Sequence, residues 1–136
     1  MEIRTFQESD EEAVIVLWKS VFNYSAPHND PATSIRCKLN LQRELFFVAI
    51  MDGKLAGTVM AGYDGHRGWI YSLAVNPALR RGGIGAALVR HAEQALQKLG
   101  CLKINLQLVA SNSQTVAFYT KLGYAVEERI SMGKII

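Results

Sequence analysis

Cysteine, proline and long apolar runs are all scarce in this chain. Of its 136 residues, only 2 are cysteines and 3 are prolines. Cys37 and Cys101 lie far apart, and no histidine stands near either at metal-ligand spacing. We therefore expect no metal site, and two thiols that are buried or unreactive. No apolar run reaches the roughly 18 residues that a membrane-spanning helix needs, and the first residues form no signal-peptide core, so we expect a cytoplasmic protein with no membrane partner.

Neither sign of charge dominates the sequence. Hydrophobic residues make up 49% and charged residues 20%, with a formal net charge of +3, which is typical of a globular chain. At this length we expect one domain, residues 1–136. The small positive excess favours an anionic ligand. Basic and aromatic residues do not alternate as they do in nucleic-acid-binding modules, so we expect no nucleic-acid partner.

The spacing of apolar residues predicts an α/β fold. Ser9-Asp10-Glu11-Glu12 is typical of a helix N-cap with acids in the first turn, and Asp30-Pro31 indicates a second helix start. Asp52-Gly53 indicates a hairpin turn, and residues 23–29 resemble a loop. The strand–helix–strand run after residue 69 requires a parallel crossover. We expect a mixed, mostly antiparallel sheet with this one parallel β-α-β crossover and helices on both faces. Its strands are expected at 2–6, 45–50, 55–63, 69–75 and 103–109, with a last strand or pair of strands within 124–136.

The most informative stretch runs from Ser72 to Leu88. Asn76-Pro77 ends a strand, because proline has no N–H for the sheet. Arg80-Arg81-Gly82-Gly83-Ile84-Gly85 then begins an amphipathic helix. Glycines let a ligand approach the backbone, and the first turn of a helix offers unpaired N–H groups at its positive dipole end. The stretch therefore predicts a phosphate or pyrophosphate site.

Two other phosphate motifs do not fit this stretch. The dinucleotide fingerprint needs glycine or alanine where Leu88 stands. The P-loop needs Ser or Thr after Gly-Lys, but Gly53-Lys54 and Gly133-Lys134 are followed by Leu and Ile. A flexible turn with solvated arginines is the alternative interpretation of this stretch.

Two separated motifs resemble those of the GNAT N-acetyltransferase superfamily. Val75-Asn76-Pro77 and the Arg80 to Gly85 run are similar to the family's motif for the pyrophosphate of acetyl-CoA. Asn112, with the Phe118 to Tyr124 run, is similar to its downstream motif, and Gly62 to Gly68 resembles the small bacterial YpeA-like members. The resemblance covers most of the chain. It implies an enzyme that moves an acetyl group from acetyl-CoA to a primary amine of a small molecule or peptide.

The resemblance also implies roles for particular residues. The pantetheine arm of acetyl-CoA would pair with the strand at 73–75, where a backbone N–H would polarise the thioester carbonyl. Asn112 would contact the pantetheine, and Tyr119 would protonate the departing thiolate. Asn112 is also explained as a helix N-cap, Tyr119 as a packed aromatic, and the strand as core. The implied donor-binding residues are Leu73, Ala74, Val75, Arg80, Arg81, Gly82, Gly83, Ile84, Gly85, Ala86, Asn112 and Tyr119.

A general base is not assigned by the sequence. Gln107 stands where relatives that acetylate protein N-termini carry Glu, and an amide cannot accept a proton from an ammonium group. Water, Tyr71, Asp64 and His66 remain as candidates, although turn chemistry alone explains Asp64. The missing base leaves a non-catalytic acyl-CoA-binding module as the alternative to an enzyme. The acceptor, expected against residues 23–44 and 64–68, and the choice between monomer and homodimer stay open.

Overall fold

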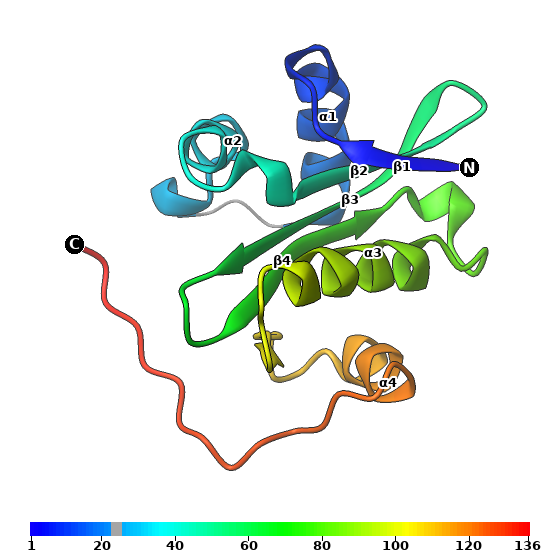
Figure 1. Ribbon diagram of the computed structural model, residues 1–136. Coiled ribbons are helices and arrows are strands. Elements are labelled where there is room, and N and C mark those ends of the chain that lie inside the picture. Colours follow the sequence, from blue (N-terminus) through cyan, green and yellow to red (C-terminus); the bar gives the residue numbers. More distant parts are fainter. Residues whose placement is uncertain (23–25) are drawn as a thin grey trace. The chain divides into compact units, whose positions relative to one another are not determined.

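A five-stranded sheet in the order β1-β2-β3-β4-β5 organises the first part of the chain (Figure 1). Neighbours from β1 to β4 pair antiparallel, and β4 pairs with β5 in parallel. The predicted mixed sheet with one parallel crossover is thus confirmed. The strands are β1 (Glu2–Thr5), β2 (Phe46–Met51), β3 (Lys54–Tyr63), β4 (Gly68–Val75) and β5 (Ile104–Asn105).

The computed structural model describes residues 1–22 and 26–136, and they form two compact units, Met1–Leu106 and Gln107–Ile136. The sheet belongs to the first unit, with α1 (Glu11–Val21), α2 (Pro31–Leu39) and α3 (Ile84–Lys98). The second unit contains α4 (Ser113–Lys121). Part of the loop predicted at 23–29 lies outside the described residues, and the rest includes a 3-10 turn at Pro27–Asn29.

Helix starts follow the expected capping chemistry in one case and depart from it in another. The Asp30 carboxylate accepts a hydrogen bond from the Thr33 backbone N–H at 3.1 Å, with Pro31 in the first turn of α2. Ser9 does not cap α1. It lies within a 3-10 turn, and Asp10 is the N-cap. The Asp10 carboxylate accepts hydrogen bonds from Arg4 at 2.8 and 3.0 Å, so its side chain joins the start of α1 to β1.

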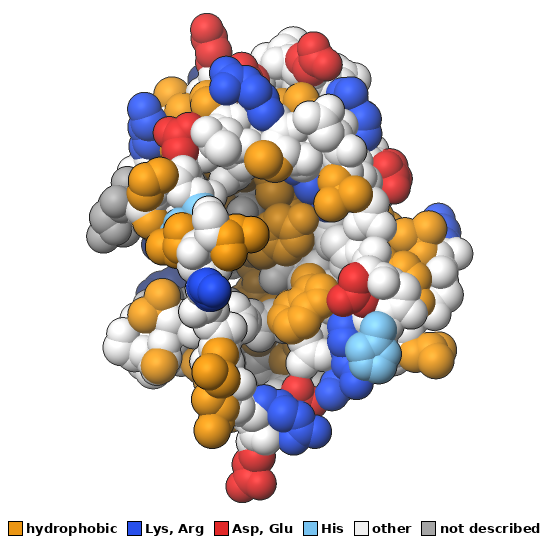
Figure 2. Space-filling view, turned by 90° about the vertical axis from the view of Figure 1, so that its left-hand side faces the viewer, with side chains coloured by type: hydrophobic (Ala, Val, Ile, Leu, Met, Phe, Trp, Pro, Cys, Tyr) orange, Lys and Arg blue, Asp and Glu red, His pale blue; other side chains and the backbone are white. Residues whose placement is uncertain are grey.

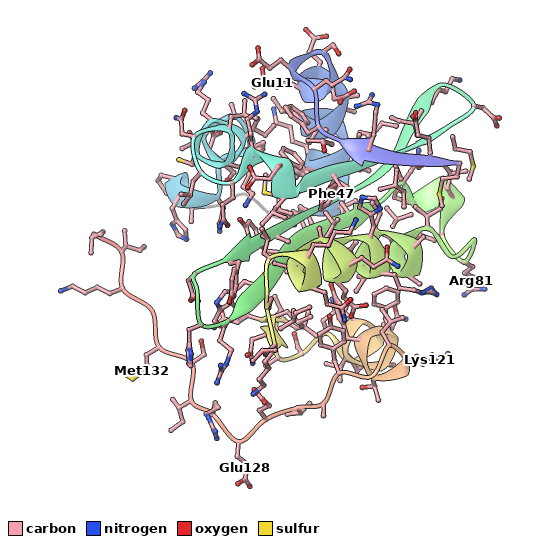
Figure 3. All side chains as sticks on the ribbon, viewed as in Figure 1. Glu11, Phe47, Arg81, Lys121, Glu128 and Met132 are labelled. Carbon is pink, nitrogen blue, oxygen red and sulfur yellow. The ribbon has the colours of Figure 1, made fainter. Side chains whose placement is uncertain are left out.

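The sheet carries helices on both faces, as predicted. Phe46 of β2 and Met60 of β3 belong to a buried cluster with Trp18 of α1 and Ile35 of α2. Phe47, the next residue of β2, points to the opposite face (Figure 3) and packs edge-on against His91 of α3, with ring centroids 4.6 Å apart. Successive strand residues point to opposite faces, so β2 supplies the core on each side.

Glycines allow α3 to approach the sheet closely. A Cβ on Gly57 of β3 would lie 2.8 Å from the Ala74 carbonyl oxygen and 3.0 Å from Leu88 Cδ1. A Cβ on Gly68 of β4 would lie 2.7 Å from Cys101 Sγ. The first turns of α3 therefore lie directly on β3, and the end of α3 with Cys101 lies directly on the start of β4. Cys101 is buried as expected, whereas Cys37 is exposed on α2.

The C-terminal part of the predicted sheet is absent from the described residues. The strand expected at 103–109 is reduced to β5, and residues 124–136 contain no strand. Only Gly68 and Trp69 pair with β5. Val126, Ile130 and Met132 are at least 86% exposed. Apolar content alone therefore did not produce a strand there.

Candidate functional site

A β-bulge interrupts β4 where the sequence resemblance places the donor. Tyr71 pairs with Met60 and Ala74 pairs with Thr58, so Val59 alone faces both Ser72 and Leu73. Ser72 has a φ of 53°, a left-handed conformation that is uncommon for a residue other than glycine. A bulge takes one residue out of the regular ladder and redirects the backbone locally. The predicted donor-binding strand is thus irregular at its centre.

A buried side chain contacts this bulge and is itself bonded to a second one. The Trp18 indole Nε1–H donates to Thr58 Oγ1 at 2.9 Å, and the Thr58 hydroxyl donates to the Ser72 carbonyl oxygen at 3.1 Å. Trp18 is 1% exposed and Thr58 is fully buried. The sequence analysis did not predict this contact, which joins residues 40 positions apart. A threonine on the apolar face of β3 was the available signal.

Beyond the bulge, β4 presents an unpaired side. β5 pairs only with Gly68 and Trp69 at the start of β4. The part of β4 that contains Leu73, Ala74 and Val75 therefore has no strand partner on the β5 side among the described residues. An extended ligand can pair with such an edge as an added strand.

The glycine-rich turn that follows β4 has the geometry of an anion site. Asn76 Oδ1 accepts the Ala78 N–H at 3.0 Å and begins a 3-10 turn, Pro77–Leu79. Arg81 and Gly83 then adopt left-handed conformations with φ of 71° and 82°. Gly83 is the N-cap of α3 and supplies no capping side chain. The N–H groups of the first turn, Ile84 to Ala86, are thus left for a ligand.

The space and charge around this turn suit a phosphate. A Cβ on Gly83 would meet no atom within 4 Å, and one on Gly82 would meet only the Leu79 carbonyl oxygen at 3.5 Å. Arg80 and Arg81 are exposed, and Arg81 points outward from the turn (Figure 3). Open backbone beside two cations is the combination that the sequence predicted.

The second unit contains the other two predicted residues, Asn112 and Tyr119. Asn112 is the N-cap of α4, and its Oδ1 accepts the Thr115 N–H at 3.1 Å. Its side chain therefore caps the helix, as the structural interpretation of this residue expects. Tyr119 is 5% exposed, with its ring edge-on to those of Phe118 and Tyr124. Burial raises the pKa of Tyr119 to about 12. The phenol therefore keeps its proton at neutral pH.

Hydrogen bonds and burial limit how well the candidate residues could accept a proton. Asp64 Oδ1 accepts the backbone N–H groups of Arg67 and His66, both at 2.7 Å, and these bonds hold the pKa of its carboxyl below the usual range. Asp64 is therefore a turn residue and a weak base. The Gln107 side-chain amide donates to Ser131 Oγ within the second unit. Burial raises the pKa of Tyr71, which opposes its action as a base.

Lys38 is a charged residue that the sequence reasoning missed. It is 6% exposed, its Nζ donates to the Ala61 carbonyl oxygen, and it lies 5.4 Å from the centroid of the Tyr71 ring. Burial lowers the pKa of this amine to about 8. Its position three residues after Ile35 places it on the buried side of α2, a helical spacing that could have revealed it.

The surface around the β3–β4 turn mixes apolar and charged groups. Trp69 and Tyr71, two residues apart on β4, are 37% and 42% exposed. On this face, exposed hydrophobic side chains are interspersed with acidic and basic ones (Figure 2). Among the described helices none has the length and apolar content to cross a membrane. Within residues 1–22 and 26–136, no group of three or more His, Cys, Asp or Glu side chains is placed to hold a metal.

Comparisons with known proteins identify the family of the chain. Residues 11–124 match the acetyltransferase (GNAT) family. The chain is 44% identical over 134 residues to an acetyltransferase of Yersinia enterocolitica, covering 98% of this chain and 94% of that one. An acetyltransferase of Pectobacterium atrosepticum is also 44% identical over 134 residues, with the same coverage.

Solved structures share the fold. Ard1 from Thermoplasma volcanium has a TM-score of 0.82 at 24% identity, over 93% of this chain and 83% of that one. The PaiA N-acetyltransferase from Thermoplasma acidophilum, solved in complex with coenzyme A, has a TM-score of 0.81 at 22% identity, over 95% of this chain and 92% of that one. The chain belongs to the acetyltransferase (GNAT) family and is an N-acetyltransferase.

Proposed function

We propose that the protein transfers the acetyl group of acetyl-CoA to a primary amine of a small molecule or peptide. The observation that carries this proposal is the junction of β4 and α3. There, an unpaired strand edge leads directly into a left-handed, glycine-containing turn and an uncapped helix N-terminus. A ligand with an extended amide-bearing arm and a pyrophosphate matches both parts.

The donor would bind through backbone groups more than through side chains. The arm would pair with Leu73, Ala74 and Val75. The pyrophosphate would accept hydrogen bonds from the first turn of α3, with Arg80 and Arg81 adding charge. Asn112 keeps the start of α4 in place and would also contact the arm. Membership of the acetyltransferase (GNAT) family supports acetyl-CoA as the donor in this proposal.

The reaction proposed is direct attack. The neutral acceptor amine adds to the thioester carbonyl carbon, and a backbone N–H at the bulge stabilises the oxygen as it gains negative charge. The C–S bond then breaks, the amine loses its extra proton to solvent, and the Tyr119 hydroxyl donates a proton to the thiolate. Neither Cys37 nor Cys101 takes part, so no acyl-enzyme forms.

The test measures binding and turnover in the intact chain. Calorimetry with acetyl-CoA and release of CoA thiol with a panel of amines (amino acids, polyamines and peptides) should show saturable binding and amine-dependent thiol release. Absence of binding would overturn the donor assignment. Binding of acetyl-CoA without turnover across the panel would exclude the tested amine classes as acceptors.

A further inference from the structure

We propose that Thr58 and Trp18 are positioning residues for acetyl transfer, because together they hold the β4 bulge in the geometry that the thioester requires. The inference rests on the proposed function and extends it to two buried side chains that touch neither substrate. Their hydrogen bonds run in one direction, from the Trp18 indole to the Thr58 hydroxyl and from that hydroxyl to the Ser72 carbonyl.

Both bonds to the Thr58 hydroxyl are accounted for. The oxygen accepts one hydrogen bond, from Trp18, and gives its own hydrogen to Ser72. Because Trp18 donates to this oxygen, the hydroxyl hydrogen turns toward the Ser72 carbonyl. No polar side-chain atom that is buried lacks a partner in the described residues. The pair is thus a complete unit that fixes one carbonyl of the bulge.

The direction of that carbonyl determines the direction of the next N–H. The described residues contain no cis peptide bond, and in a trans peptide the C=O and N–H point in opposite directions. The Ser72 carbonyl points to Thr58 of β3. The Leu73 N–H therefore points away from the Thr58 hydroxyl, toward the opposite side of β4. That is where the proposed thioester lies.

The bulge needs a partner of this kind. Ser72 holds a φ of 53° without being glycine, a conformation that persists only when its surroundings impose it. The position of Thr58 opposite Ala74, next to the irregular pairing, lets its side chain reach the bulged peptide. Removing the hydroxyl removes that constraint and leaves the Trp18 N–H without its acceptor.

Three substitutions separate positioning from packing. Thr58→Val keeps the shape of the side chain and removes the hydroxyl. Thr58→Ser keeps the hydroxyl and removes a buried methyl, so it lowers stability but retains the bond. Trp18→Phe keeps a ring in the core and removes the indole N–H. Its effect should lie between those of the other two, because the Thr58 hydroxyl can still donate to Ser72.

Two spectroscopic measurements test the proposal, one on the conformation of Ser72 and one on the hydrogen bond to the thioester. The ¹³C shifts of Ser72 by NMR report the left-handed conformation in the protein alone. The infrared carbonyl band of acetyl-CoA, labelled with ¹³C at the thioester, reports the hydrogen bond from the bulge. We expect the parent and Thr58→Ser to show left-handed Ser72 shifts and a band moved to lower frequency on binding. In Thr58→Val, Ser72 should leave its left-handed shifts, and at least half of the infrared displacement should disappear.

Kinetics complete the test. In Thr58→Val, kcat should fall about tenfold or more, because a misdirected oxyanion donor loses much of its effect. The KM for acetyl-CoA should change less than twofold. Unchanged Ser72 shifts or an unchanged carbonyl band in folded Thr58→Val would overturn the inference. So would losses in Thr58→Ser equal to those in Val. Failure of the parent to bind acetyl-CoA would instead overturn the proposed function.

Discussion

Lys38 shows how a buried charge links stability to pH. Its amine is in contact with the Ala61 carbonyl and the Tyr71 ring, and its pKa falls from an ordinary 10.5 to about 8 because burial disfavours the charged form. Between these values the unfolded chain binds more protons than the folded one, so the free energy of unfolding rises with pH. The nearby Glu44 partly opposes this lowering of the Lys38 pKa, and burial raises the pKa of Tyr71, the ring that Lys38 faces.

Lys38→Met should remove this pH dependence. Urea unfolding of parent and variant at pH 7 and pH 9.5 should show the parent gaining stability relative to Lys38→Met as the pH rises. Lys54→Met, at an exposed lysine, is the matched control, and its difference from the parent should stay constant. A parent–variant difference for Lys38→Met that does not change with pH would show that its amine is not desolvated.

Tyr119→Phe tests the proposed general acid. The variant keeps the ring contacts with Phe118 and Tyr124 and removes the proton. We expect kcat to fall toward the lower end of the 10²–10⁴ range for acid–base catalysis, about 10². With a pKa of about 12, the phenol is a weak acid for a thiolate that leaves readily. The affinity for acetyl-CoA should hardly change.

The control for that experiment is Tyr124→Phe, which removes a hydroxyl from the neighbouring ring of the same aromatic cluster. Its kcat should match that of the parent. Equal rates for all three proteins, measured by release of CoA thiol, would return Tyr119 to a packing role.

At the scale of the element, two glycines of the turn before α3 are needed for different reasons: Gly83 for its backbone conformation and Gly82 for access to the backbone. Gly83 has a positive φ, so any side chain there strains the backbone. Gly82 does not have a positive φ, and a Cβ added to it would make only an ordinary contact, with the Leu79 carbonyl oxygen. Gly82 is therefore the position at which access to the backbone can be blocked without disturbing the turn.

Gly82→Val should weaken acetyl-CoA binding about tenfold or more, because the branched side chain covers the approach to the first turn of α3. The midpoint of thermal unfolding should stay close to that of the parent. Gly133→Val is the matched control, since that glycine also has free space around it and no recorded positive φ. Calorimetry that gives Gly82→Val the parent's affinity would remove the phosphate site from this turn.

At the scale of the whole molecule, helix caps and turns could be predicted from neighbouring residues. Features that depend on contacts between distant segments could not. Asp30-Pro31, Asp52-Gly53 and Asn112 act through neighbours within a few residues, so their caps and turns were predictable. The apolar period of α3 and the parallel crossover were predictable for the same reason. Burial of the Lys38 amine and the bond between Trp18 and Thr58 depend on segments 23 and 40 residues apart.

The strands predicted in the C-terminal part of the chain were mostly wrong, and the reason again lies in contacts beyond the local sequence. A strand needs a neighbouring backbone as well as suitable side chains, and β5 is only two residues long. The site follows the same division. The turn at Arg80 to Gly85 was visible in the sequence, whereas the bulge was not, because Ser72 does not differ in type from residues found in regular strands.

The bulge depends on one extra residue in β4 relative to β3. Its flanking pairs, Tyr71 with Met60 and Ala74 with Thr58, differ by one residue in their count along the two strands. Deleting Ser72 equalises that count. Leu73 would then face Val59, and every later residue of β4 would keep its partner and its face of the sheet. A one-residue deletion inside a strand, ordinarily among the most damaging of changes, is here expected to leave a folded and more regular protein that has lost acetyl transfer, which amide spectra and thiol release would show together.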